Sequence, residues 1–173
     1  KPFEIKMAFM SGGDVAEPLA QNYIQSWKKI GIKAVLTSGR LLAFQNFYEK
    51  VEGDSKDIDV FFGAWGVGTT LDPTSSAGRK SQLNYSRFVS EENDRLMAEI
   101  LGEKSLTVPN YKAEAFKNWQ KYYIGQAVEV PLMYRYKLTP VNKRLKNVYI
   151  GYDAALKDEG IYKWELTAIN PMR

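Results

Sequence analysis

Residues 4–36, "EIKMAFMSGGDVAEPLAQNYIQSWKKIGIKAVL", decide the fold. Apolar residues alternate from Glu4 to Phe9, the pattern of a β-strand with one face against a core. After a Ser-Gly-Gly-Asp turn, apolar residues recur every three or four positions and share one helical face. They are Leu19, Tyr23, Trp27 and Ile30. Residues 32–36 form the next strand. A strand, a helix and a strand in this order predict a parallel βαβ unit.

The spacing of polar residues predicts where the first helix begins. Asp14 and Glu17 are three positions apart, as in a capping box, in which the two side chains satisfy backbone N–H groups reciprocally. Lys28 and Lys29 suit the negative, carboxyl-terminal end of the helix dipole, and Gly31 suits the position just after the helix ends.

A second helix and a third strand extend this unit. The second helix has its apolar residues on one stripe, at Phe44, Phe47, Tyr48 and Val51. The third strand runs from Ile58 to Trp65 and is apolar on both faces, which is typical of a central parallel strand. The β-α-β-α-β order predicts an α/β fold with an open, mostly parallel sheet flanked by helices.

The rest of the chain is predicted to be helical and then irregular. "SEEN", from Ser90, caps one helix, and Asn110 opens a longer one whose inward side carries Tyr111, Ala115, Trp119, Tyr122 and Tyr123. Residues 129–136, "EVPLMYRY", are predicted to form a strand. Beyond Leu138, short strand-like pieces alternate with turns. We therefore expect residues 1–173 to form a single α/β lobe with an irregular C-terminal extension.

The composition narrows the classes of function that are possible for this chain. The 173 residues are 45% hydrophobic, with a net charge of +4 and neither Cys nor His. Disulfides, thiolate metal sites and His-based catalysis are therefore excluded. The basic residues are scattered, which argues against a nucleic-acid partner. No apolar run is long enough to span a membrane. We expect no catalytic residues, no metal and no cofactor.

The loop after the third strand is the best candidate for a site. Ligands of open α/β sheets bind beyond the carboxyl ends of the strands, and "GAWGVGTTLDP" lies there, at residues 63–73. Trp65 offers a broad apolar wall, while the small residues from Gly66 to Thr70 let a ligand approach the backbone. Asp72, before Pro73, is predicted to fix the loop by an Asx-type turn.

Several motifs in order carry a family resemblance. They are "AQNYIQSWKKIGIKAVL" at residues 20–36, "DIDVFFGAWGVGTTLDPTSSAGRKSQLNYSRFVSEENDRLM" at 57–97 and "VPLMYRY" at 130–136. Together they resemble the C-terminal lobe of the solute-binding proteins that serve oligopeptide and dipeptide ABC importers.

The resemblance implies one lobe of a two-lobed, type II periplasmic-binding-protein-like fold, excised from a larger protein. Such a protein would be a monomer that closes over an extended oligopeptide and delivers it to ABC permease subunits in the membrane. It would lie on the extracellular face of the membrane, lipid-anchored in a Gram-positive organism, or in the periplasm.

The resemblance also implies the site residues. Trp65 corresponds to a Trp beside the ligand, and Asn84 and Tyr85 fall where relatives line the cleft. In enteric-type relatives an Asp three residues after that Trp pairs with the peptide amino terminus, but Gly68 stands there in this chain. We therefore expect backbone hydrogen bonds to an extended peptide. The predicted site is Trp65, Gly66, Val67, Gly68, Thr69, Asp72, Asn84 and Tyr85.

Three alternatives stay open. Within the same family, the protein would bind a signalling peptide (a pheromone) or a nickel chelate. In a different class, it would be an α/β enzyme that uses Asp72 as a base, which requires a second polar group beside Asp72. The leading interpretation is a binding module and not an enzyme.

Overall fold

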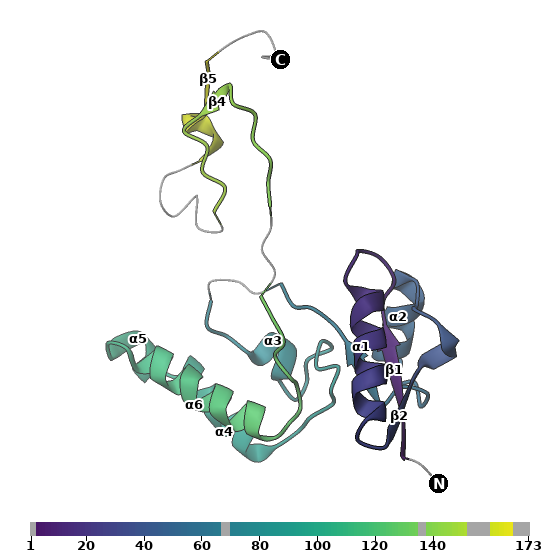
Figure 1. Ribbon diagram of the computed structural model, residues 1–173. Helices are drawn as coiled ribbons and strands as arrows, with labels where there is room; N and C mark the ends of the chain where they lie inside the picture. Colours follow the sequence, from purple (N-terminus) through teal and green to yellow (C-terminus); the bar gives the residue numbers. More distant parts are fainter. Residues whose placement is uncertain (1–2, 67–69, 135–137, 152–159, 168–173) are drawn as a thin grey trace.

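The computed structural model describes residues 3–66, 70–134, 138–151 and 160–167 (Figure 1). Its elements are β1 (Phe3–Phe9), α1 (Ala16–Lys28), β2 (Ile32–Leu36), η1 (Thr37–Gly39), α2 (Phe44–Glu52), β3 (Val60–Phe62), α3 (Thr74–Ala77), α4 (Glu91–Leu101), α5 (Lys104–Thr107), α6 (Tyr111–Gly125), β4 (Leu145–Lys146), η2 (Ile161–Lys163) and β5 (Glu165–Leu166). Over these described ranges, no helix has the length and apolar content that crossing a membrane requires.

Three parallel strands form one sheet in the order β2–β1–β3. Ile5 of β1 lies opposite Ala34 of β2, and Met7 lies opposite both Leu36 and Val60. Because the strands run in the same direction, their carboxyl ends meet at one edge of the sheet. The predicted parallel β-α-β-α-β unit is confirmed.

A helix covers each face of the central strand. On one face, Met7 and Phe9 pack with Ala20 of α1 in one buried cluster. On the other face, Ala8 packs with Phe47 of α2. Successive strand residues point to opposite faces, so Met7, Ala8 and Phe9, which are buried in succession, are all apolar, whereas Glu4 and Lys6 lie in the exposed first half of the strand.

The third strand differs from its prediction. We expected a central strand from Ile58 to Trp65, whereas β3 ends at Phe62 and pairs, within the described sheet, with β1 alone. Both of its faces are nevertheless covered. The ring of Phe62 stacks on that of Phe9 with centroids 5.3 Å apart, while the ring of Phe61 belongs to the cluster under α2. An apolar edge strand between two helices therefore has the sequence pattern of a central strand.

The start of the first helix also differs from its prediction. Helix α1 begins at Ala16, with Val15 at the N-cap, and among the described residues no side chain caps it. A capping box would need Asp14 at the N-cap, one residue earlier. Glu17 remains in the first turn, where its charge suits the helix dipole. Ile30 lies beyond the helix end and is 71% exposed, so it does not share the inward face.

A second buried cluster lies between α4 and α6. Ser90 caps α4 by accepting a hydrogen bond from the backbone N–H of Asn93, as predicted. Asn93 is buried, with 1% of the residue exposed. Its side-chain amide nitrogen donates to the carbonyl of Ala77 at 2.9 Å, and its amide oxygen accepts from the indole N–H of Trp119 at 2.9 Å. The buried apolar residues are Ala77, Leu96, Met97, Ile100, Ala115, Trp119 and Tyr123. The predicted inward stripe of α6 is confirmed at its central positions.

Beyond α6 the chain is extended. The strand predicted at residues 129–136 is absent over its described part, 129–134. Val130 is 74% exposed and Tyr134 is 90% exposed. A strand needs a neighbour for its backbone N–H and C=O groups, and none of the described strands pairs with this segment. Farther on, β4 and β5 form an antiparallel pair that projects away from the helices (Figure 1), which confirms the irregular C-terminal extension.

Candidate functional site

Trp65 lies just beyond the carboxyl end of β3, at the sheet edge where open α/β folds bind ligands. Its side chain is exposed, with 42% of the residue accessible to solvent. The indole stacks on the ring of Tyr85, with centroids 5.5 Å apart and planes inclined by 17°. The structure thus brings together two of the predicted site residues from different loops.

Other aromatic rings continue from this stack. Tyr85 meets Tyr48 edge-on at 6.3 Å, and Tyr48 meets Phe44 at 4.8 Å. Phe44 is the first residue of α2 and is 66% exposed. We call Trp65, Tyr85, Tyr48 and Phe44 the aromatic row. The sequence placed both α2 residues on one apolar stripe of the helix and did not predict them at the site. The available signal was the position of Phe44 at the start of the helix that follows β2.

The hydroxyl of Tyr85 fixes one end of its ring by a hydrogen bond. It donates a hydrogen bond to the carboxylate of Glu52, the last residue of α2, at 3.0 Å. Burial, followed by this contact with Glu52, raises the pKa of Tyr85 above its ordinary value of 10.0. The phenol therefore stays protonated near neutral pH and remains a donor to Glu52.

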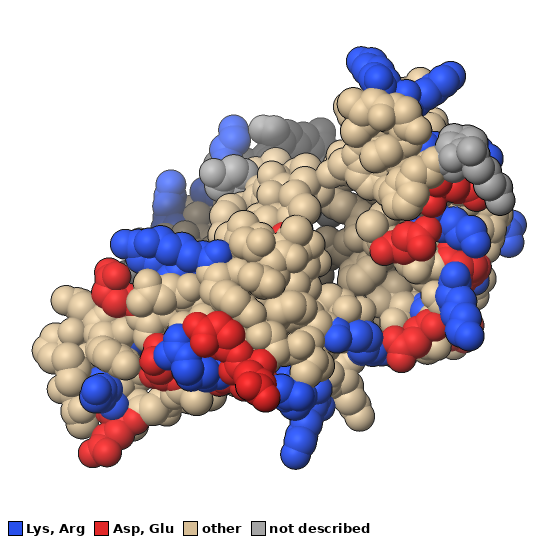
Figure 2. Space-filling view, turned by 90° about the horizontal axis from the view of Figure 1, so that it is seen from below, with Lys and Arg blue, Asp and Glu red and all other residues tan. Residues whose placement is uncertain are grey.

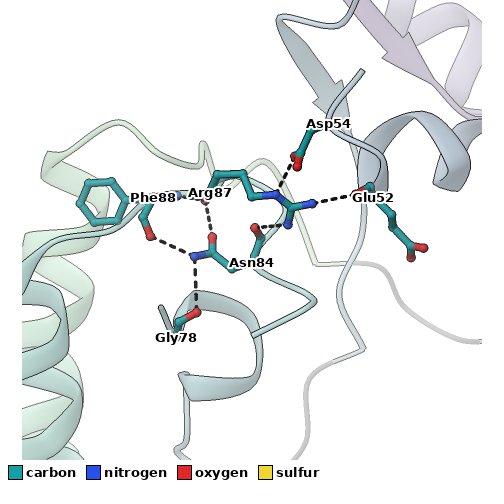
Figure 3. A network of polar contacts seen from close by, with 7 residues as sticks. Glu52, Asp54, Gly78, Asn84, Arg87 and Phe88 are labelled. Carbon is teal, nitrogen blue, oxygen red and sulfur yellow. Dashed lines mark hydrogen bonds and ion pairs between the residues drawn. The ribbon is translucent and has the colours of Figure 1, made fainter. Parts of the chain in front are cut away.

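Arg87 ties the same loop to the end of α2 (Figure 3). Its Nε donates to the carboxylate of Asp54 at 2.6 Å, one Nη donates to the carbonyl of Asn84 at 2.8 Å, and the other Nη donates to the carbonyl of Glu52 at 2.9 Å. A guanidinium presents its donors in a planar fork, so one side chain can serve three acceptors. The loop and the helix end are therefore cross-linked.

Asn84 is buried beneath this network and is 2% exposed. Its amide nitrogen donates to the carbonyls of Phe88 at 2.9 Å and Gly78 at 3.4 Å (Figure 3), and its oxygen accepts from Ser86 at 2.9 Å. In this structure the side chain holds the loop together. Its predicted contact with a ligand stays a prediction.

Asp72 fixes the loop that follows Trp65. One carboxylate oxygen accepts from the backbone N–H of Thr74 at 2.9 Å and from its hydroxyl at 2.6 Å. This is the predicted Asx-type turn, and it precedes α3. The bonds from Thr74 lower the pKa of Asp72 below its ordinary value. Such a carboxylate is a weak base, which disfavours the alternative in which Asp72 abstracts a proton.

The remaining predicted site residues lie in the turn after Trp65. A side chain at Gly66 would meet open space, as expected of a loop that faces solvent. Val67, Gly68 and Thr69 lie outside the described residues.

A second polar cluster joins the segment that precedes β3 to α2 and to the residue after β2. Asp57 accepts hydrogen bonds from Lys50 at 2.7 Å, from Thr37 at 3.0 Å and from Ser55. These bonds, with that of Lys50 the strongest, hold the pKa of Asp57 well below its usual range. The described residues contain no group of three acidic side chains suited to a metal ion.

The chain is similar to known peptide-binding proteins, although no family model matches it. It is 30% identical over 156 residues to the oligopeptide-binding protein OppA of Lactococcus lactis subsp. cremoris (strain SK11) and to that of Lactococcus lactis subsp. lactis. These matches cover 89% of the chain and 26% of each relative. The chain thus spans about a quarter of the length of the curated relatives it matches.

A solved structure shows the same fold. It is described as lactococcal OppA complexed with an endogenous peptide in the closed conformation. The TM-score is 0.63 at 28% identity, over 73% of this chain and 24% of that one.

Proposed function

We propose that this chain, which is similar over most of its length to OppA, is a segment of an OppA-like solute-binding protein and that its aromatic row is one wall of an oligopeptide-binding cleft. The observation that carries the proposal is the stack of Trp65 on Tyr85 at the carboxyl edge of the sheet. The indole stacks on Tyr85 on one side, and 42% of the residue remains accessible to solvent. Aromatic rings of this kind bury large apolar area on binding at a small cost in conformational entropy.

We propose that the peptide lies extended along this edge. Extended peptides are held chiefly through their main chain, while shallow pockets accept varied side chains. The open space around Gly66 permits such an approach to the loop backbone. Because Gly68 stands where enteric-type relatives have an anchoring Asp, main-chain hydrogen bonds rather than an ion pair at this position hold the peptide in this proposal.

The chain serves, in this proposal, as the C-terminal lobe of a two-lobed protein. Exposed apolar side chains after α6 support this, because contiguous exposed apolar surface marks a contact region. They include Val130, Leu132, Met133 and Tyr134. The relatives are also about four times longer than the matched segment. Closure of the two lobes over the peptide would follow the hinge motion of binding proteins.

In the same proposal, the whole protein acts as a monomer outside the cytoplasm and passes its peptide to ABC permease subunits. In a Gram-positive organism a lipid anchor would hold it to the outer face of the membrane. Acidic and basic side chains interleave on the face shown in Figure 2, which does not suit nucleic acid.

The experiment is to purify the full-length protein under native conditions, denature it and analyse the released small molecules by mass spectrometry. We expect a mixture of oligopeptides, and a smaller amount from the Trp65→Ala variant. The proposal fails if no peptide is released and if a pool of random octapeptides leaves the thermal unfolding temperature unchanged.

A further inference from the structure

We propose that Arg87 is a positioning residue for Trp65, acting through Glu52 and Tyr85. This inference rests on the proposed peptide site, and it assigns a role in binding to a residue outside the aromatic row. Arg87 cross-links a loop to α2. Glu52 accepts hydrogen bonds at both its backbone carbonyl and its carboxylate, and Tyr85 lies against Trp65.

The first step is the cross-link. Arg87 donates to Glu52 and Asp54 on the side of α2 and to Asn84 on its own loop. Both Asp54 and Arg87 have a positive φ, at 52° and 55°. Non-glycine residues adopt such angles at a cost, so the surrounding contacts must hold them. The guanidinium supplies these contacts for both segments at once.

The second step is at Glu52, which accepts hydrogen bonds at two of its groups. Its backbone carbonyl accepts from Arg87 at 2.9 Å, and its side-chain carboxylate accepts from the hydroxyl of Tyr85 at 3.0 Å. Arg87 and Tyr85 are close in sequence, and they donate to the backbone carbonyl and to the side-chain carboxylate of Glu52 respectively. The hydroxyl end of Tyr85 is therefore fixed relative to the end of α2.

The third step is the support of the indole. Tyr85 is fixed at its hydroxyl and bordered by the rings of Tyr48 and Phe61, each at 6.3 Å. Its remaining face carries Trp65. An exposed side chain without such support would occupy several rotamers and would lose that freedom on binding. Holding the indole in one orientation before the peptide arrives removes this cost.

The test compares variants of the full-length protein labelled with 5-fluorotryptophan, with Trp65→Phe identifying the Trp65 signal in the fluorine NMR spectrum. Arg87→Lys keeps the charge but loses the planar fork. Tyr85→Phe keeps the ring and loses only the bond to Glu52. The matched control is Arg95→Lys, because Arg95 on α4 also pairs with two carboxylates, Glu92 and Glu99.

We expect Arg87→Lys and Tyr85→Phe to shift or broaden the Trp65 signal selectively and Arg95→Lys to leave it in place. Retention of a random octapeptide pool, measured by equilibrium dialysis, should fall about two- to tenfold in Arg87→Lys, the cost of ordering one side chain on binding. An unchanged Trp65 signal in both variants would overturn the positioning role, as would a change spread equally over all tryptophan signals. If the wild-type protein retains no octapeptide, the proposed function itself fails.

Discussion

The indole of Trp65 lies nearly parallel to the ring of Tyr85, with centroids 5.5 Å apart, so a residue following β3 is supported by one from a later loop. The loop that supplies Tyr85 is fastened to α2 by Arg87. The proposed ligand wall is thus built from three segments that are separate in sequence.

Replacing the exposed indole should weaken binding far more than folding. We expect Trp65→Ala to lower the retention of a random octapeptide pool by at least about tenfold, as for an aromatic residue that dominates a binding surface. The free energy of unfolding should change by no more than about 1.5 kcal/mol, because the residue is 42% exposed. Equilibrium dialysis and urea unfolding of the full-length protein measure the two effects. The control is Ile30→Ala, an exposed apolar residue beyond α1, which should change neither quantity.

The charge of Asp72 should be unimportant for binding. Asn in its place still accepts a hydrogen bond from Thr74, so the Asx-type turn persists. We expect Asp72→Asn to retain free and amino-terminally acetylated octapeptides in the same ratio as the wild-type protein. A selective loss of peptides with a free amino terminus would instead show that Asp72 pairs with that charge.

The buried amide of Asn93 should be essential for stability. Asn93→Ala leaves the indole N–H of Trp119 and the carbonyl of Ala77 without their partner in the core. We expect the free energy of unfolding to fall by about 2–4 kcal/mol, the cost of unsatisfied buried polar groups together with a cavity. Urea denaturation followed by circular dichroism measures the change. Asn22→Ala, at an exposed position on α1, should cost no more than about 0.5 kcal/mol; equal losses in the two variants would contradict the role of Asn93.

Asp57 should make the protein sensitive to acid. Its pKa in the folded state is lowered, chiefly by Lys50, below the value of 3.8 expected when the chain is unfolded. The stabilisation is therefore fully present above that unfolded value and is lost as the pH falls below it toward the folded pKa. We expect Asp57→Asn to be less stable than the wild-type protein near neutral pH and to lose less stability between about pH 5 and pH 3.

Urea unfolding at a series of pH values, with the exposed Asp14→Asn as the control, tests this prediction. The control should follow the wild-type curve. If Asp57→Asn has the same slope of stability against pH as the wild-type protein, the contacts of Asp57 with Lys50 and Thr37 do not set the acid sensitivity.

Local patterns in the sequence were sufficient to predict the α/β unit. Strand alternation and helical periodicity act over a few residues, so β1, α1 and β2 could be predicted directly. The order of strands in the sheet is a long-range property, and β3 lies at an edge of the described sheet although its sequence is typical of a centre. Both environments bury two faces of a strand, so composition does not separate them.

In the candidate site, too, some features follow from local sequence and others depend on long-range contacts. Trp65 could be placed from its position after a strand, and Asp72 from its position before Pro73. The support of Trp65 by Tyr85 joins residues 20 positions apart, and the bonds from Tyr85 and Arg87 to the end of α2 join residues 33 to 35 positions apart. Nothing in the local sequence of Arg87 indicates its partners on α2. Asn84 was assigned by resemblance to the cleft, whereas its amide bonds to its own loop.

The claim that a peptide lies against the aromatic row is tested most directly by photo-crosslinking. Octapeptides that carry one benzoylphenylalanine are bound to the full-length protein, irradiated and mapped by mass spectrometry. We predict crosslinks to Trp65 or Tyr85 that disappear when unlabelled octapeptide is in excess. Saturable crosslinking confined to residues outside the aromatic row and the loop after β3 would contradict the proposed site.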